Sequence, residues 1–186
     1  VAWAVRYFKS LARAKIETGS FRQVVLLGLD DSTLVGAPVK MLHGSLSNLR
    51  RPDAIIVDKA GYEYLWGQEP IRLGRTLEMN DHRAVLVGIC EATAPFQTFP
   101  VVYTRYSQAV QFVAGERKVM SFVLTKPHTG VTDKALAQRI HEKTGLMAQT
   151  RREFMWFVIG YYMRNTGIPV NFGITIALGF IVGTAI

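Results

Sequence analysis

Side chains able to perform acid–base, nucleophilic or metal chemistry are few and widely spaced in this sequence of 186 residues. The four histidines are His43, His82, His128 and His141, and none lies three or four positions from another histidine or from Cys90. Two ligands on one helix face need that spacing, so the sequence has no metal-binding signature. We therefore expect no metal site and no cofactor.

The remaining candidates for catalysis are one cysteine and one acidic pair. Cys90 lies in the apolar run VLVGICEA, which indicates a buried, unreactive thiol. Asp30 and Asp31 follow another apolar run, and a turn is the commoner reason for two aspartates there. The phosphate-binding patterns G-x-x-x-x-G-K-[ST] and G-x-G-x-x-G and the nucleophile pattern G-x-S-x-G do not occur. The sequence therefore predicts no catalytic residue and a protein that is not an enzyme.

The elements expected around these residues mix strands and helices without a regular βαβ alternation, which favours an α+β fold with a mixed sheet. Asn80-Asp81 is a turn pair between two apolar runs and predicts the clearest hairpin. Thr132 and Gly145 suit the two ends of an amphipathic helix, and residues 33–49 are expected to form a loop with short helical pieces. Strands are expected at residues 4–15, 22–29, 54–57, 71–79, 84–91, 100–103 and 119–125, and helices at 59–66, 107–113 and 132–143.

The composition excludes several classes of protein. Apolar residues make up 49% of the chain and charged residues 19%, so the chain can bury a core and is not disordered. The single cysteine excludes an internal disulfide. The net charge of +8 suggests an anionic partner. Because the basic residues are scattered along the chain, a solvated basic surface or one facing acidic lipid headgroups is favoured, and no nucleic acid is expected as a partner.

The end of the chain is a candidate membrane span. Residues 168–186 carry no formal charge, and as a helix they would extend about 28 Å, close to the hydrocarbon thickness of a bilayer. Small residues at a spacing of four let another helix approach closely in lipid, so we expect helix packing at Gly173, Ala177, Gly179 and Gly183. The alternative is a buried core helix.

An aromatic segment precedes this span. Residues 154–163, FMWFVIGYYM, are too few to cross a bilayer. Trp and Tyr favour the headgroup region, so residues 150–166 are expected to form a helix at the membrane surface. Gly167 and Pro169 would mark a kink or a new helix start. The expected interface residues are Trp156, Phe157, Tyr161 and Tyr162, and the alternative is a core helix of a soluble domain.

These features predict three consecutive parts. Residues 1–149 would form an α+β domain, residues 150–167 a membrane-proximal interfacial helix, and residues 168–186 a membrane helix. The chain begins at Val1 and stops at Ile186 without a polar flank. We therefore expect a piece of a longer protein, cut within or just after a membrane span.

Six stretches, taken in order, have the pattern of a known family: RQVVLLGLDDSTLVGAP (22–38), LRRPDAIIVDKAGYEYLW (49–66), PIRLGRTLEMNDHRAVLVGICEA (70–92), FPVVYTRYSQAVQFV (99–113), GLMAQTRREFMWFVIGYYMRNTGI (145–168) and GFIVGTAI (179–186). Their order resembles the extracytoplasmic domain and second membrane helix of MacB/FtsX-like ABC transporter permeases, especially the DevC-like branch. The resemblance covers most of residues 20–186, and Asn80-Asp81 stands where that family usually has Gly in its hairpin turn. It implies that residues 1–149 are the extracytoplasmic domain, residues 150–167 a stalk helix and residues 168–186 the truncated start of the FtsX-like permease domain.

The resemblance implies a dimeric permease subunit of the bacterial inner membrane, with residues 1–167 outside the cytoplasm. A cytoplasmic ABC ATPase would supply energy, and the permease would transmit the resulting conformational change without catalysis of its own. A periplasmic membrane-fusion adaptor and membrane lipid are the other implied partners. We expect loops 40–48 and 94–98 to contact the adaptor. The alternative is an extracytoplasmic sensor or ligand-binding domain held by a membrane helix.

Overall fold

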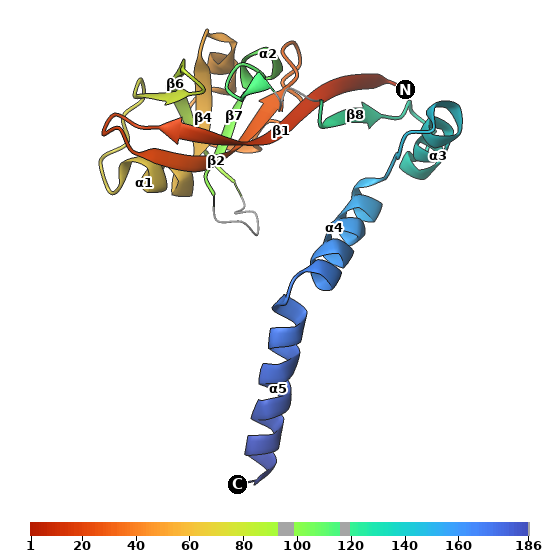
Figure 1. The fold of residues 1–186 in the computed structure, drawn as a ribbon. Helices are drawn as coiled ribbons and strands as arrows, with labels where there is room; N and C mark the ends of the chain where they lie inside the picture. Colours follow the sequence, from red (N-terminus) through yellow and green to blue (C-terminus); the bar gives the residue numbers. More distant parts are fainter. Residues whose placement is uncertain (93–98, 116–119, 186) are drawn as a thin grey trace. The chain divides into compact units, whose positions relative to one another are not determined.

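The computed structural model describes residues 1–92, 99–115 and 120–185. Residue contacts divide the chain into two compact units. The first, called here the sheet unit, is Trp3–Thr125, and the second, the C-terminal unit, is Val1–Ala2 together with Lys126–Ile186. The sheet unit carries the strands, and three helices follow one another in the C-terminal unit (Figure 1). The predicted α+β class with a mixed sheet is confirmed.

Eight strands form one sheet among the described residues, and six of them are paired in a closed ring. The ring runs β1-β2-β7-β4-β6-β5 and returns to β1, with parallel pairing at β2–β7 and β4–β6. Closure removes the open edges that a flat sheet would expose. The strands are β1 (Trp3–Lys15), β2 (Phe21–Leu29), β3 (Lys40–Gly44), β4 (Ala54–Asp58), β5 (Thr76–Met79), β6 (His82–Glu91), β7 (Val101–Arg105) and β8 (Phe122–Lys126).

Two hairpins form, and one of them is the hairpin predicted at Asn80-Asp81. β1 and β2 pair from Phe8↔Gly28 to Lys15↔Phe21. β5 and β6 are joined by Asn80 and Asp81, whose φ angles of 51° and 61° are those of a two-residue turn that matches the strand twist. β5 is shorter than predicted, because Gly74 has φ of +90° just before it.

The structure contains one strand that was not predicted, because residues 33–49 were expected to form a loop with short helical pieces. β3 lies within that segment and pairs with β6 through an irregular register between Met41 and His43. Its residues are exposed or half-buried and show no alternation. Pairing with a neighbouring strand, rather than local sequence preference, therefore makes this segment a strand.

The helices start and end largely where the capping residues predict. They are η1 (Leu46–Arg50), α1 (Lys59–Trp66), α2 (Tyr106–Ala109), α3 (Asp133–Thr144), α4 (Arg151–Asn165) and α5 (Ile168–Ala185). Thr132 accepts a hydrogen bond from the Ala135 amide, and Gly145 ends α3 with φ of 69°. α2 is shorter than the predicted helix, and Val119 of the predicted last strand lies outside the described residues.

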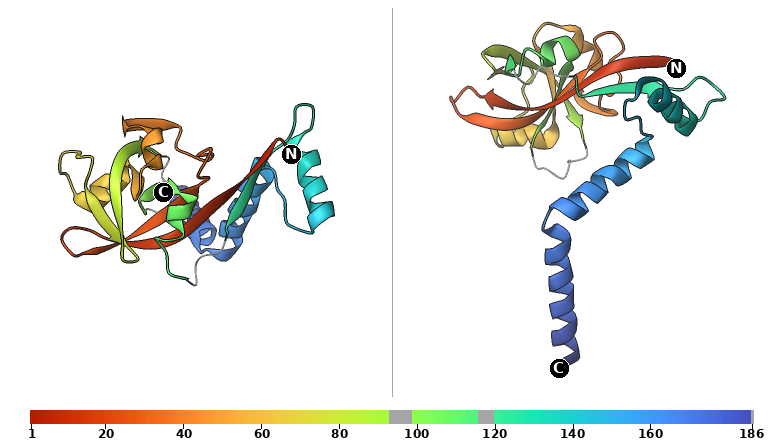
Figure 2. Two further views of the ribbon diagram at one scale, coloured as in Figure 1. Left: turned by 90° about the horizontal axis from the view of Figure 1, so that it is seen from above. Right: turned by 45° about the vertical axis from the view of Figure 1, so that its right-hand side comes forward.

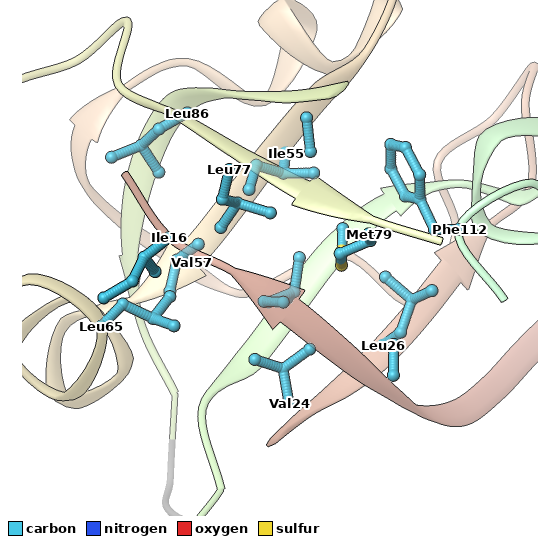
Figure 3. Close-up of a cluster of buried hydrophobic side chains, with 14 of the residues drawn as sticks. Ile16, Val24, Leu26, Ile55, Val57, Leu65, Leu77, Met79, Leu86 and Phe112 are labelled. Carbon is cyan, nitrogen blue, oxygen red and sulfur yellow. The ribbon is translucent and has the colours of Figure 1, made fainter. Parts of the chain in front are cut away.

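The larger core lies inside the ring of strands. Figure 3 shows ten of its apolar side chains pointing toward one another from strands, turns and helices: Ile16, Val24, Leu26, Ile55, Val57, Leu65, Leu77, Met79, Leu86 and Phe112. α2 packs so closely on β2 that a Cβ on Gly28 would lie 2.7 Å from the Ala109 Cβ. A second apolar cluster, which includes Leu29, Leu49 and Tyr103, completes the burial.

Candidate functional site

Cys90 is buried in the sheet unit and is unsuited to act as a nucleophile. It is fully buried on β6, opposite Asp58 in the strand register. Burial, and to a lesser extent the charge of Asp58, raises the pKa of its thiol to about 12. The predicted burial of Cys90 is confirmed, and a raised pKa disfavours the reactive thiolate at neutral pH.

Asp58 is a buried carboxylate that the sequence analysis did not single out. Its Oδ1 accepts a hydrogen bond of 2.7 Å from the Val101 amide, and its Oδ2 accepts one of 3.3 Å from the Gly61 amide. Burial raises its pKa, although these amides favour the charged form. The carboxylate thus joins β4 to β7 and caps α1, which is a structural task. An Asp directly before the helical pattern of residues 59–66 was the available signal.

Asp30 and Asp31 do not form a carboxylate pair for acid–base chemistry. Asp30 accepts hydrogen bonds from Ser32 and from the amide and hydroxyl of Thr33, and these bonds lower its pKa to about 2. Asp31 instead accepts a hydrogen bond of 2.6 Å from the Ser107 hydroxyl, at the start of α2. Asp30 organises a turn, as predicted, whereas Asp31 links that turn to α2. Among the described residues there is also no group of three His, Cys, Asp or Glu side chains arranged to hold a metal ion.

α4 exposes most of its apolar surface. None of its residues is buried, and the exposed fractions of Trp156, Phe157 and Tyr161 are 58%, 48% and 56%. Tyr162 is half-buried, and its ring meets that of Tyr161 edge-on at 5.9 Å. A complete capping box holds the first turn, because Thr150 and Glu153 each bond the other's backbone amide. The helix is therefore well formed locally but lacks a cover for its apolar side chains.

A bend separates α4 from α5 (Figure 2), and the angle between them is 67°. Three polar side chains close α4 by donating to its last carbonyl groups: Arg164 to Gly160, Asn165 to Tyr161 and Thr166 to Tyr162. Thr166 is extended, and Pro169 cannot donate a backbone hydrogen bond. The predicted break near Gly167 and Pro169 is confirmed.

α5 is apolar on every side, and its apolar side chains are exposed. Phe172, Ile176 and Phe180 have exposed fractions of 66%, 70% and 73%. Its two threonine side chains are satisfied within the helix: Thr175 donates to the Asn171 carbonyl and Thr184 to the Phe180 carbonyl. Within the described residues no helix by itself meets the length and hydropathy expected of a membrane span, but α4 and α5 meet them as a bent pair.

The small residues expected to mediate helix packing all lie on α5. At 100° per residue Gly173 and Ala177 fall on one stripe and Gly179 and Gly183 on another. A Cβ built on any of the three glycines meets no atom within 4 Å. These glycines are therefore not required by any contact within the described chain, and their packing role stays a prediction.

Trp156 and Phe157 come together with charged residues in a shallow hollow of the C-terminal unit. Lys134 and Arg152 supply its two cations, and Glu153 supplies its one carboxylate. The residues that line it are Lys134, Thr150, Arg152, Glu153, Trp156 and Phe157. Sequence reasoning did not link Lys134 with the aromatic segment, because sixteen positions separate Lys134 from Thr150, and the remainder of α3 and a loop lie between them. The only available signal was the basic pair Arg151-Arg152 beside the aromatic run.

Comparisons with known proteins identify the fold. No protein-family model matches the sequence, and no curated protein matches it significantly. The chain is similar to the extracellular domain of the noncanonic ABC-type transporter YknZ from Gram-positive bacteria, with TM-score 0.56, 15% identity, and coverage of 80% of this chain and 79% of that one. It is also similar to the periplasmic region of MacB from Actinobacillus actinomycetemcomitans, with TM-score 0.56, 16% identity, and coverage of 88% and 76%. The expected resemblance to MacB-like extracytoplasmic domains is thus confirmed for the fold.

Proposed function

We propose that this chain is the extracytoplasmic domain and the beginning of the membrane domain of an ABC-type permease subunit. The observation that carries the proposal is an uncharged, exposed apolar helix, α5, that follows a domain with the fold of transporter extracytoplasmic regions. In this proposal residues 1–149 lie outside the cytoplasm, residues 150–167 lie at the membrane surface, and residues 168–186 enter the bilayer.

The hydrogen bonding of α5 supports insertion into lipid. A helix within the hydrocarbon must satisfy its polar groups internally, since no water is available there. Thr175 and Thr184 do so through bonds to backbone carbonyls. The 18 residues of α5 extend about 27 Å, close to the hydrocarbon thickness.

The hydrogen bonds made by acidic side chains of the sheet unit agree with a role in transmitting movement rather than in catalysis. The buried carboxylate of Asp58 and the turn formed by Asp30 and Asp31 are engaged in structural hydrogen bonds. The energy would come from ATP hydrolysis by a cytoplasmic ABC ATPase. The permease, as a homodimer, would pass the movement through α5 and α4 to the sheet unit and to a periplasmic adaptor.

Loop 40–48 is the part of the proposed adaptor surface that the structure describes, and it contains the exposed strand β3. The other expected contact loop, 94–98, lies outside the described residues. Substitutions in loop 40–48 that leave adaptor binding unchanged would contradict this assignment.

Cysteine labelling in intact cells tests the orientation. The full-length protein carrying Gln68→Cys should react with a membrane-impermeant maleimide before lysis, because Gln68 is exposed in the proposed extracytoplasmic domain and lies outside the proposed adaptor surface. The protein without this substitution is the matched control, since Cys90 is buried. Labelling at Gln68→Cys that occurs only after lysis would contradict an extracytoplasmic location.

A second measurement tests the coupling to ATP. With the partner ATPase present, ATP should change the maleimide labelling rate of Tyr161→Cys on α4, because that helix would move with the membrane domain. Labelling rates that are the same with and without ATP would contradict transmission through α4.

A further inference from the structure

The charges of the two units are arranged differently. All five ion pairs found among the described residues lie in the sheet unit. The sequence from residue 126 onward has seven basic residues and only three acidic ones, Asp133, Glu142 and Glu153. In the described structure none of these basic residues makes an ion pair: Lys126, Lys134, Arg139, Lys143, Arg151, Arg152 and Arg164.

The hollow between α3 and α4 combines two of these cations with an aromatic surface. Lys134 and Arg152 line it together with Trp156 and Phe157. Its one carboxylate, Glu153, already accepts a hydrogen bond of 2.8 Å from the Thr150 amide. A ligand that fits this surface has an anionic group for the cations and an apolar part for the two rings.

The bend brings these cations near the membrane, an argument that rests on the proposed function. At 1.5 Å per residue, Arg152 lies about 20 Å along α4 from Asn165. If α5 lies along the membrane normal, α4 is inclined to that normal by 67°. Arg152 is then only about 8 Å farther from the membrane than Asn165 is. A headgroup layer is roughly 5–7 Å thick, and charges act over about 8 Å at physiological ionic strength.

We infer that the hollow formed by Lys134, Arg152, Trp156 and Phe157 binds the headgroup of an anionic phospholipid, with the acyl chains against the aromatic rings. The cations favour acidic headgroups, and Trp and Phe pack on the adjoining hydrocarbon. α4 is thereby held close to the bilayer surface by specific lipid contacts, and its orientation depends on the lipid composition.

Fluorescence quenching in vesicles tests this inference. The full-length protein is reconstituted into equal amounts of phosphatidylglycerol and phosphatidylcholine, with brominated chains on one lipid at a time. Trp156→Phe serves as the blank, so the difference reports Trp156 alone. Brominated phosphatidylglycerol should quench Trp156 severalfold more than brominated phosphatidylcholine, because each cation near the surface favours acidic lipid about fivefold. The preference should weaken as salt is added.

Variants show whether the hollow itself selects the lipid. Lys134→Gln with Arg152→Gln should lower the quenching ratio to near one, whereas Arg152→Lys should retain the preference. The matched control is Arg51→Gln with Lys59→Gln, two exposed cations of the sheet unit, which should leave the ratio unchanged.

Negative results can be assigned either to the lipid inference or to the proposed membrane location. Equal quenching by both lipids in the unchanged protein overturns the inference but leaves membrane insertion intact. Retention of the preference in Lys134→Gln with Arg152→Gln also overturns it. No quenching by either lipid contradicts the proposed membrane location itself.

Discussion

The sheet unit buries many of its apolar side chains, whereas the C-terminal unit leaves most of those on α4 and α5 exposed. In the sheet unit Phe8, Leu26 and Ile55 are fully buried, and four basic side chains are neutralised in ion pairs. In α4 and α5 apolar side chains remain exposed, and no ion pair is described. The difference teaches that the first unit carries its own solvent-excluding core, whereas the apolar side chains of α4 and α5 are not enclosed by the described residues.

The contrast also extends to hydrogen bonding. Polar side chains of the sheet unit bond across long stretches of sequence, as Asp58 does with Val101. The polar side chains of α4 and α5 bond within about one helical turn, as Thr175 does with Asn171. Bonds within a helix remain available in lipid, where no water can replace them, so these side chains of α4 and α5 need no tertiary partner there.

Truncating a core aromatic residue is expected to have the largest effect. Phe8→Ala removes a fully buried side chain that meets the Tyr106 ring edge-on at 6.1 Å, and it should lower the free energy of unfolding of the sheet unit by about 3–5 kcal/mol. Thermal or urea unfolding measures the loss. Phe172→Ala on α5 is the control and should leave that transition unchanged. An equal loss of unfolding free energy from both substitutions would contradict the difference in burial between the two units.

A charge within α5 should weaken membrane insertion without changing the stability of the sheet unit. Ile176→Lys should leave unfolding of the sheet unit unchanged but disfavour membrane insertion by about 2.5–3.5 kcal/mol, because a charge at the centre of a span is costly. Alkaline extraction of membranes measures the fraction released. Val39→Lys, at a fully exposed apolar position of the sheet unit, should release none. Normal retention of Ile176→Lys would argue that α5 does not span the bilayer.

Glycine substitutions on α5 separate insertion from packing. A Leu at Gly179 or Gly183 meets no atom of this chain within 4 Å of its Cβ, so insertion should persist. Packing against a neighbouring helix should weaken by about 1–2 kcal/mol, or roughly tenfold. Crosslinking or single-molecule association in bilayers measures it, with Val182→Leu as the control. Unchanged assembly and transport in both glycine variants would remove the proposed packing role.

The smallest effect concerns the turn at Asp30 and its dependence on pH. Its hydrogen bonds lower the pKa of the folded Asp30 carboxyl from its ordinary 3.8 to about 2, so the charged carboxylate stabilises the fold above pH 4, and this stability is lost as the pH falls toward 2. Since the group is partly exposed, Asp30→Asn should cost only about 1 kcal/mol at pH 7. Urea unfolding at pH 7 and pH 2.5 should show a smaller difference at the lower pH. Glu63→Gln, on the exposed side of α1, is the control, and a difference that does not change with pH would contradict the assignment.

Several parts of the fold could be predicted from local sequence. Asn80-Asp81 predicted its hairpin, Thr132 and Gly145 predicted the ends of α3, and Gly167 with Pro169 predicted the break after α4. Each signal works through the few residues on either side of it. Other features depended on partners distant in the sequence, and β3 is the clearest example, since only its pairing with β6 makes it a strand.

The candidate site divides in the same way. The uncharged run of residues 168–186 and the aromatic run of residues 154–163 are properties of the sequence alone, because hydropathy and length are summed along the chain. Only the tertiary structure decided three other features: the ring of strands, the hydrogen bond by which Asp58 joins β4 to β7, and the hollow that Lys134 and Trp156 both line. The physical reason is that these features depend on which distant residues become neighbours, and that follows from the packing of the whole chain rather than from any local preference.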